Sequence, residues 1–245
     1  MSPRVTLATG GRVMLQLRHD PRTVALLVLV PVVLLVLCKG LFADQGGTFS
    51  QVGAILVGIF PLISMFLVTS ITMLRERTTG TLERLLTMPM AKLDLLLGYG
   101  LAFAAFAIVQ ATVVSAVAFW ALGLDVAGSL AGFFLLAILN SILGMALGLF
   151  ASAFAKTEFQ AVQFMPAFIL PQLLLCGLFV PRDQMWRALE ILSYALPMTY
   201  AVDAIDRIAT DGSLGSTGAL DVGITIGATL LVLALGAMTL RRRTA

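Results

Sequence analysis

Six stretches of this sequence run for 16 to 30 residues without a charged side chain. A helix needs about 20 apolar residues to cross the hydrocarbon core of a bilayer, and lipid tolerates no exposed irregular backbone. The runs therefore predict an all-α integral membrane protein with six transmembrane helices. The predicted spans are Thr23–Cys38, Gln45–Leu74, Leu95–Leu124, Val126–Ala155, Phe159–Pro181 and Val222–Leu240.

Composition argues against an ordinary soluble domain. Only 12% of the 245 residues are charged and 59% are hydrophobic, whereas soluble domains carry about a quarter charged residues. The first span is the shortest, and we expect Lys39 to extend its long side chain to water while residues 40–43 complete the crossing. No small-residue cleavage pattern follows Cys38, so we expect this span to be retained and not removed as a signal peptide.

Basic side chains predict the orientation, because Lys and Arg are retained in cytoplasmic loops. With the N-terminus inside, the outer segments hold only four of the 16 Lys and Arg residues, and the other twelve lie in cytoplasmic segments. Both termini are therefore predicted to be cytoplasmic. The four outer residues are Lys39, Arg182, Arg187 and Arg207.

Two segments outside the predicted spans are expected to form shorter helices. Residues 1–22 are basic and amphipathic, which favours a helix along the inner membrane surface; the alternative is a solvated tail. In the outer loop of residues 182–221, the apolar stretch Ile191–Val202 is too short to cross and contains Pro197. We expect short re-entrant or interfacial helices there, before the last span.

The predicted spans contain no ionisable side chain, which argues against a transporter driven by protons or sodium. Their polar residues more often bond neighbouring helices than bind a substrate. Gly144 and Gly148 form a small-xxx-small pair, which serves packing inside the chain or a dimer interface. Cys38 and Cys176 lie in apolar runs and are predicted to be buried and unpaired. The polar residues are Gln110, Ser115, Asn140, Ser141, Gln163 and Gln172.

The sequence contains no recognisable catalytic, metal-binding or nucleotide-binding motif. It contains no G-x-x-x-x-G-K-[ST] loop for a nucleotide. The single histidine, His19, lies among basic residues at the predicted membrane edge. No carboxylate pair or nucleophile with a base stands out. We therefore predict that the chain is not an enzyme, binds no metal or cofactor, and has no nucleic-acid partner.

The loop between the second and third spans, residues 75–92, is the most informative segment. It reads Arg-Glu-Arg-Thr-Thr-Gly-Thr-Leu-Glu-Arg-Leu-Leu-Thr-Met-Pro from Arg75 to Pro89. As a helix it gathers leucines on one side, and Thr79 or Thr81 provides an N-cap. The alternative is a plain loop with solvated charges. A helix held between two spans is also what a contact that transmits force requires.

The pattern Arg-Glu-Arg-x-x-Gly-Thr-Leu-Glu-x-Leu-Leu-x-x-Pro resembles the signature of permease subunits of the second type of ABC exporter. A second match is Leu-Pro-Met-Thr-Tyr-Ala-Val-Asp-Ala-Ile-Asp-Arg, which ends at Arg207. The family has Leu-Pro-x-Thr-Tyr-x-x-Glu/Asp-x-Ile/Leu-Arg there, and this sequence departs from it by the additional Asp206. The resemblance covers the whole chain, 1–245, as one permease domain. The matching outer residues are Pro197, Tyr200, Asp203 and Arg207.

The resemblance implies a mechanism. Two permease chains, identical or paralogous, would pair among the lipids of the bacterial plasma membrane. Two ATPase subunits, which bind ATP and Mg, would sit beneath them and move the coupling helix Arg75–Pro89. Residues 1–22 would form a second ATPase contact. The residues expected at the coupling contact are Arg75, Glu76, Gly80, Thr81, Leu82, Glu83, Leu86 and Pro89.

The substrate is less constrained, since the family exports drugs, lipids, polysaccharides and haem-related compounds. Flexible Met and aromatic side chains suit a hydrophobic or amphipathic compound, although they also pack bundles or face lipid. We expect export of a drug or antibiotic; the alternatives are export of a lipid or glycolipid, or a non-transporting scaffold of the same fold. The residues predicted to line the pathway are Phe60, Met65, Phe66, Phe164, Met165 and Phe168.

Overall fold

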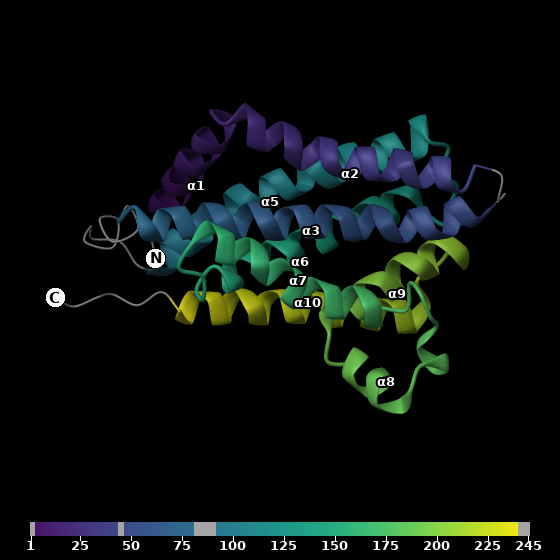
Figure 1. The fold of residues 1–245 in the computed structure, drawn as a ribbon. Helices are drawn as coiled ribbons and strands as arrows, with labels where there is room; N and C mark the ends of the chain where they lie inside the picture. Colours follow the sequence, from purple (N-terminus) through teal and green to yellow (C-terminus); the bar gives the residue numbers. More distant parts are fainter. Residues whose placement is uncertain (1–2, 44–46, 81–91, 240–245) are drawn as a thin grey trace.

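The computed structural model describes residues 3–43, 47–80 and 92–239, and every regular element in these ranges is a helix (Figure 1). The all-α prediction is therefore confirmed. The long helices are α2 (Pro21–Leu41), α3 (Thr48–Thr78), α5 (Lys92–Ala116), α6 (Leu130–Ala151), α7 (Glu158–Leu175) and α10 (Gly215–Met238). The shorter ones are α1 (Pro3–Arg18), the π-helix η1 (Val117–Ala121), the 3₁₀ turn η2 (Arg182–Gln184), α8 (Arg187–Ser193) and α9 (Pro197–Thr210).

The long helices lie side by side and give the bundle two distinct ends (Figure 1). At one end, called the α1 end, α1 lies beside the C-terminal part of α3, and α10 finishes there as well. Arg77 Nη2 of α3 is 3.5 Å from Thr239 Oγ1, just beyond α10. The other end, called the α9 end, carries α8 and α9. The described chain therefore starts and finishes at the same end of the bundle.

Five of the long helices are long and apolar enough to cross a membrane: α2, α3, α5 with η1, α6 and α10. Helix α7 is not among them, because its 18 residues include three glutamines and two prolines. Its direction still matches that of a span. Glu158 at its start bonds Arg75 at the α1 end, and Gln172 Oε1 accepts from Met198 N of α9 at 3.3 Å. An 18-residue helix is about 27 Å long.

Helix α2 shows why the shortest predicted span suffices. Asp20 caps it by accepting hydrogen bonds from the backbone N–H and the hydroxyl of Thr23, at 3.2 and 2.6 Å. Pro21 then occupies the first turn, where its missing N–H costs nothing. The helix continues through Lys39 to Leu41, and the Lys39 ammonium lies 4.6 Å from the Phe49 ring centroid. The helix thus extends beyond Cys38 as expected, but it ends at Leu41 and not at residue 43; that it completes a membrane crossing stays a prediction.

The α3–α6 contact is the tightest in the core, and small residues make it possible. A Cβ at Gly144 would lie 2.7 Å from the carbonyl carbon of Leu62, and one at Gly148 would lie 3.0 Å from the Phe66 Cα. Thr69 of α3 lies in this contact: its hydroxyl donates to Met65 O of its own helix at 2.6 Å and also lies 3.3 Å from Met145 O of α6. The Gly144–Gly148 pair thus packs inside the chain, which decides between the two roles left open by the sequence.

Helix α2 contains Pro31, which has no N–H to bond the carbonyl of Leu27 four residues earlier. Gln110 of α5 replaces that donor: its Nε2 donates to Leu27 O at 2.7 Å. Gln110 is fully buried. Without its amide, the Leu27 carbonyl would be buried with no hydrogen bond, which would destabilise the fold. Gln110 of the third span therefore joins two helices, as predicted for polar residues within the spans.

We expect Gln110→Leu to destabilise the chain by about 1–2 kcal/mol, because the Leu27 carbonyl loses its donor in an apolar core. Thermal unfolding of the detergent-solubilised chain measures this loss. Gln163→Leu is the matched control, since Gln163 is exposed on α7 and its replacement should change stability by less than about 0.5 kcal/mol. Equal effects of the two changes would contradict the proposed role of Gln110.

The outer loop contains two short helices before α10, as predicted. The apolar stretch Ile191–Val202 does not form one helix, because Pro197 starts a new one: α8 ends at Ser193 and α9 begins at Pro197. Thr199 Oγ1 donates to Ser193 O at 2.9 Å and holds the turn between them. Helix α9 buries one apolar face, including Met198, Val202 and Ile205, against α3 and α6. A re-entrant position in a membrane stays a prediction.

Candidate coupling site at the end of helix α3

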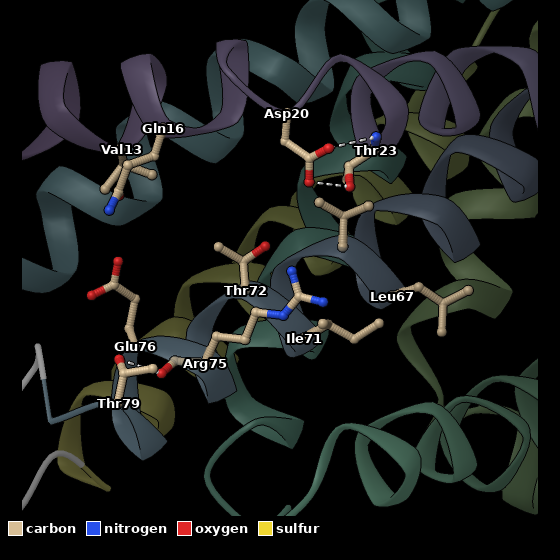
Figure 2. Close-up of a pocket in the computed structure, with 11 residues that line it drawn as sticks. Val13, Gln16, Asp20, Thr23, Leu67, Ile71, Thr72, Arg75, Glu76 and Thr79 are labelled. Carbon is tan, nitrogen blue, oxygen red and sulfur yellow. Dashed lines mark hydrogen bonds between the residues drawn. The ribbon is translucent and has the colours of Figure 1, made fainter.

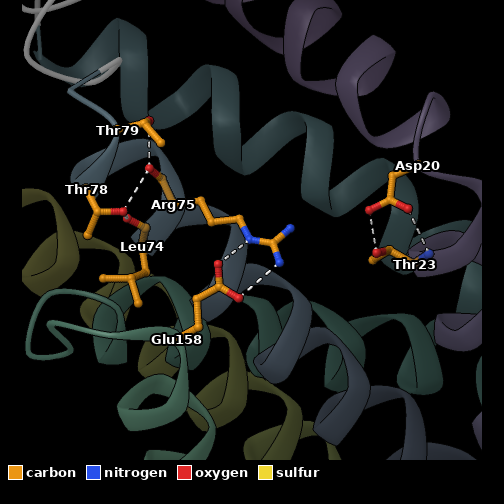
Figure 3. A network of polar contacts seen from close by, with 7 residues as sticks. All are labelled: Asp20, Thr23, Leu74, Arg75, Thr78, Thr79 and Glu158. Atoms are coloured by element: carbon orange, nitrogen blue, oxygen red, sulfur yellow. Dashed lines mark hydrogen bonds and ion pairs between the residues drawn. The ribbon is translucent and has the colours of Figure 1, made fainter.

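Arg75 and Glu76 lie in the last turn of α3, so the helix continues into the segment predicted as a loop. It ends where Thr79 N bonds Arg75 O at 2.9 Å, and Gly80 follows with a left-handed φ of 72°. The side chains of Thr78 and Thr79 also bond Arg75 O (Figure 3). Thr81, Leu82, Glu83, Leu86 and Pro89 lie outside the described residues, and a coupling helix there stays a prediction.

Glu76 joins α3 to α1 and α5. Its side chain is 9% exposed and its Oε2 lies 3.7 Å from Arg12 Nη2 of α1. The same guanidinium donates to the hydroxyl of Tyr99 on α5 and lies 5.7 Å from the ring centroid. Tyr99 is fully buried. The end of α3 is therefore linked to α1 and α5 through one cluster, in which Glu76 and Tyr99 are buried and Arg12 is about one third exposed.

The N-terminal helix α1 is packed against α5 and is not a solvated tail. A Cβ at Gly98 of α5 would lie 2.6 Å from the Cβ of Thr9, so only glycine allows the two helices to approach this closely. Thr6 Oγ1 donates to Asp94 Oδ1 at 3.4 Å near the start of α5. Val13 is buried in the same contact. The N-terminal segment is therefore a helix, as predicted, and it contacts α3 through Arg12 and α5 through Thr9; its position along the inner membrane surface stays a prediction.

Arg75 connects α3 to α7. Its Nε and Nη2 donate to the two carboxylate oxygens of Glu158 at 2.7 and 3.0 Å, a two-pronged ion pair (Figure 3). Both side chains are about half exposed, so the pair alone contributes less than about 1 kcal/mol. The ion pair mainly fixes the orientation of α7 relative to the end of α3, because a planar guanidinium binds both carboxylate oxygens in one direction only. The end of α3 thus contacts α1, α5 and α7.

A cavity of about 410 Å³ lies between the α1–α2 junction and the end of α3. Figure 2 shows Asp20 and Thr23 on one side of it and Thr72, Arg75 and Glu76 on the other. The hydrogen bonds from Thr23 hold the pKa of Asp20 below its usual range, so this carboxylate is ionised at neutral pH. The positive charge of Arg75, which lines the same cavity, lowers the pKa of Asp20 further.

The four predicted outer residues lie together at the α9 end. Pro197 begins α9, and the Tyr200 hydroxyl donates to Tyr194 O at 2.7 Å. Asp203 pairs with Arg182, and Arg207 Nε lies 3.5 Å from Asp221 Oδ2 of α10. Arg207 therefore pairs across helices and not with the additional Asp206 beside it. Burial raises the pKa of Asp206.

Burial also raises the pKa of Asp203 to about 6, against the opposing effect of Arg182, from an ordinary value of 3.8. The Asp203 carboxyl group thus binds its proton more tightly in the folded chain than in the unfolded chain. The protonated carboxyl group therefore stabilises the fold below about pH 4, and this stabilisation is lost as the pH rises through 6. We expect the wild type to lose on the order of 1 kcal/mol relative to Asp203→Asn over that window. Thermal unfolding of both proteins from pH 4 to 7 tests this, and parallel curves would contradict it.

Five of the six residues predicted to line a substrate pathway gather around one cluster between α3 and α7. Phe66 and Phe168 have ring centroids 6.3 Å apart, and Phe164 meets Phe168 edge to face at 6.1 Å. Phe66 is fully buried, whereas Phe60, Phe164, Met165 and Phe168 are partly exposed. Met65 belongs to a different cluster, together with Tyr99 and Phe103. A role in substrate passage stays a prediction for all six.

The sequence did not reveal Arg12, Asp20, Tyr99 and Glu158 as parts of the site. Only Asp20 carries a local signal, as an acidic residue directly before a proline at a helix start. The other three reach the end of α3 from helices far away in the chain, so no spacing in the sequence indicates them. Both cysteines are free and buried, as predicted.

Comparison with known proteins gives one consistent answer. The model of the ABC-2 type transporter family matches residues 5–208. The probable multidrug ABC transporter permease YbhR of Escherichia coli is 31% identical over 62% of this chain and 42% of its own length, and YbhS is 24% identical over 72% and 47%. ABC transporter G family member 20 of Dictyostelium discoideum is 27% identical over 59% and 20%.

The chain thus spans less than half the length of the relatives that it matches. The family match nevertheless covers more than half of the chain, and it includes the end of α3, the α1 contact and the outer motif. Several helices are apolar enough to cross a bilayer. The chain is a multi-pass membrane protein and belongs to the ABC-2 type transporter family.

Proposed function

We propose that the chain is the permease subunit of an ATP-driven exporter that moves a hydrophobic or amphipathic compound, of the drug or antibiotic class, out of the cell. Two ATPase subunits bind ATP and Mg and act on two permease chains. The observation that carries the proposal is the Arg12–Glu76–Tyr99 cluster, in which Glu76 and Tyr99 are buried. It joins three helices at the end of α3, where the predicted coupling sequence Arg75–Pro89 begins.

The proposed topology has six crossings with both termini in the cytoplasm. Five helices qualify as spans by length and apolarity. Helix α7 supports the sixth crossing, since it runs from the α1 end to the α9 end. An even number of crossings also agrees with a described chain that starts and finishes at one end of the bundle. The Lys and Arg distribution puts that end in the cytoplasm.

The names of the relatives favour a drug over a lipid as substrate. YbhR and YbhS are each described as a probable multidrug permease, and a partly exposed aromatic cluster on α3 and α7 provides an adaptable apolar surface. Export of a lipid or glycolipid is the second candidate, supported by apolar residues exposed along α2, such as Leu29 and Leu37.

Transport into inside-out membrane vesicles tests the function. Vesicles that contain the chain and its ATPase should accumulate a hydrophobic fluorescent dye when ATP is added, and vanadate should stop the uptake. A fluorescent phospholipid analogue is followed in parallel. ATP-dependent movement of the phospholipid without the dye would replace the first candidate with the second, and movement of neither would overturn both.

A further inference from the structure

The α9 end carries a segment that packs little against the rest of the bundle. Residues 177–192, called the outer strap, lead from the end of α7 through α8, and none of these described residues is buried. Helix α8 packs mainly against α7 and η2, and Figure 1 shows it projecting from the bundle. The strap begins at Gly177, whose left-handed φ of 97° is free of steric strain only for glycine. Segments with few buried contacts open at a low free energy.

One ion pair ties the outer strap to α9. Arg182 of η2 donates to the carboxylate of Asp203, and the two side chains are only 22% and 18% exposed. The same guanidinium lies 5.5 Å from the ring centroid of Tyr194. The Arg187–Glu190 pair lies within α8 and does not reach the bundle. In the ranges that the structure describes, Arg182 thus makes the only ion pair between the strap and the bundle.

The strap also forms one wall of a cavity of about 530 Å³, and α3 and α9 form the facing wall. Leu178 of the strap and Ile55 of α3 line this cavity and also belong to the cluster around Phe66 and Phe168. That cluster contains five of the six residues predicted to line the substrate pathway. The cavity therefore adjoins the predicted pathway, at the end of the bundle that the proposed topology places outside the cell.

We propose that the outer strap is a lid over the outlet of the export pathway and that the Arg182–Asp203 ion pair is its latch. The inference rests on the proposed function, because it assigns the outlet of that exporter. The closed strap holds the Asp203 carboxylate away from water, and Arg182 compensates its charge. Without Arg182 the buried carboxylate has lost that partner, so opening of the strap, which hydrates it, becomes more favourable.

Cys176, directly before the strap, reports its opening. Its side chain is fully buried, and its Sγ lies 3.1 Å from Leu173 O. A methanethiosulfonate with a permanent positive charge reaches this thiol when the surrounding chain opens, so the labelling rate measures the open fraction. Cys38→Ala removes the other cysteine of the sequence. Mass spectrometry of the intact chain then counts the label on Cys176 alone.

The latch is tested on the chain purified from its native membranes with its bound partners and placed in lipid nanodiscs. Labelling is done at about pH 8, where Asp203 is ionised because its pKa is about 6. Arg182→Gln should accelerate labelling about tenfold. Addition of Asp203→Asn to this variant should remove most of the acceleration, since no buried charge is then left without a partner. Arg187→Gln is the matched control and should stay within about twofold of wild type.

The lid is tested by adding ATP to the same preparation. Labelling of Cys176 in the wild-type strap should rise about threefold or more during turnover, because the outlet must open for export. The unfolding temperature of each variant is measured alongside. It should stay close to the wild-type value, since the strap buries none of its residues in the bundle.

Three outcomes overturn the inference. Labelling of Arg182→Gln at the wild-type rate would show that the ion pair is no latch. A double variant labelled as fast as Arg182→Gln, or an unfolding temperature that falls in step with labelling, would show that Arg182 only supports the fold. Labelling that ignores ATP while dye uptake is intact would show that the strap is no lid. Loss of dye uptake in the wild type would instead overturn the proposed function, and the labelling without ATP would still test the latch.

Discussion

Gly144→Leu should prevent this chain from folding into its native bundle. Even the first carbon of a side chain at this position would lie 2.7 Å from the Leu62 carbonyl carbon and 2.8 Å from its Cα, both in the backbone of α3. A backbone cannot rotate away as a side chain does, so α3 and α6 must separate and lose their shared core. We expect a loss of about 3 kcal/mol or more, measured as lower folded yield and a lower unfolding temperature in detergent.

Gly227→Leu is the matched control for this substitution. Gly227 lies on α10, and a Cβ there would have no atom within 4 Å apart from its chain neighbours and the nearby backbone of its own helix. The same side chain should therefore be tolerated, with a stability change within about 0.5 kcal/mol. A Gly144→Leu protein that unfolds at the wild-type temperature would contradict the close α3–α6 approach on which the bundle depends.

Glu83→Lys should abolish most transport without unfolding the helices. Glu83 belongs to the coupling pattern that the resemblance assigns to the ATPase contact, and a reversed charge at such a contact opposes binding. We expect ATP-dependent dye uptake to fall about tenfold or more, which corresponds to roughly 1.4 kcal/mol. The measurement pairs vesicle uptake with the unfolding temperature of the purified chain.

The control for this change is Asp125→Lys, which reverses an exposed charge in the turn between η1 and α6, away from the α1 end. Uptake should remain within twofold of wild type, since no ATPase contact is expected there. Unchanged transport by Glu83→Lys would remove the coupling role from this residue. A lower unfolding temperature would instead show that its effect is on folding.

Much of the fold follows from the sequence, because lipid leaves a chain few alternatives. Charge-free runs predict the long helices since only helices satisfy their own backbone in a bilayer. The end of the second span was less accurate: α3 continues through Arg75 and Arg77, beyond the predicted end at Leu74, whereas the continuation of α2 past Lys39 was expected. Charged residues do not terminate a helix when their side chains reach water or a partner, so a count of apolar residues places such an end too early.

The candidate site could be predicted only in part. Glu76 and Arg75 were found through the family pattern, but their partners come from α1, α5 and α7. These contacts depend on how helices pack, which the sequence alone does not specify. Pro31 shows the same limit, since its position predicts an unpaired carbonyl at Leu27 but not that Gln110 of another helix would bond it.

Purification of the tagged chain from its native membranes, in mild detergent, tests the central claim most directly. We expect a soluble ATPase with a G-x-x-x-x-G-K-[ST] loop to accompany the chain in stoichiometric amount, and to be lost when Glu76→Gln and Glu83→Lys are combined. A chain that purifies alone, or only with unrelated membrane proteins, would contradict the account and favour a membrane scaffold that shares the family fold without transporting.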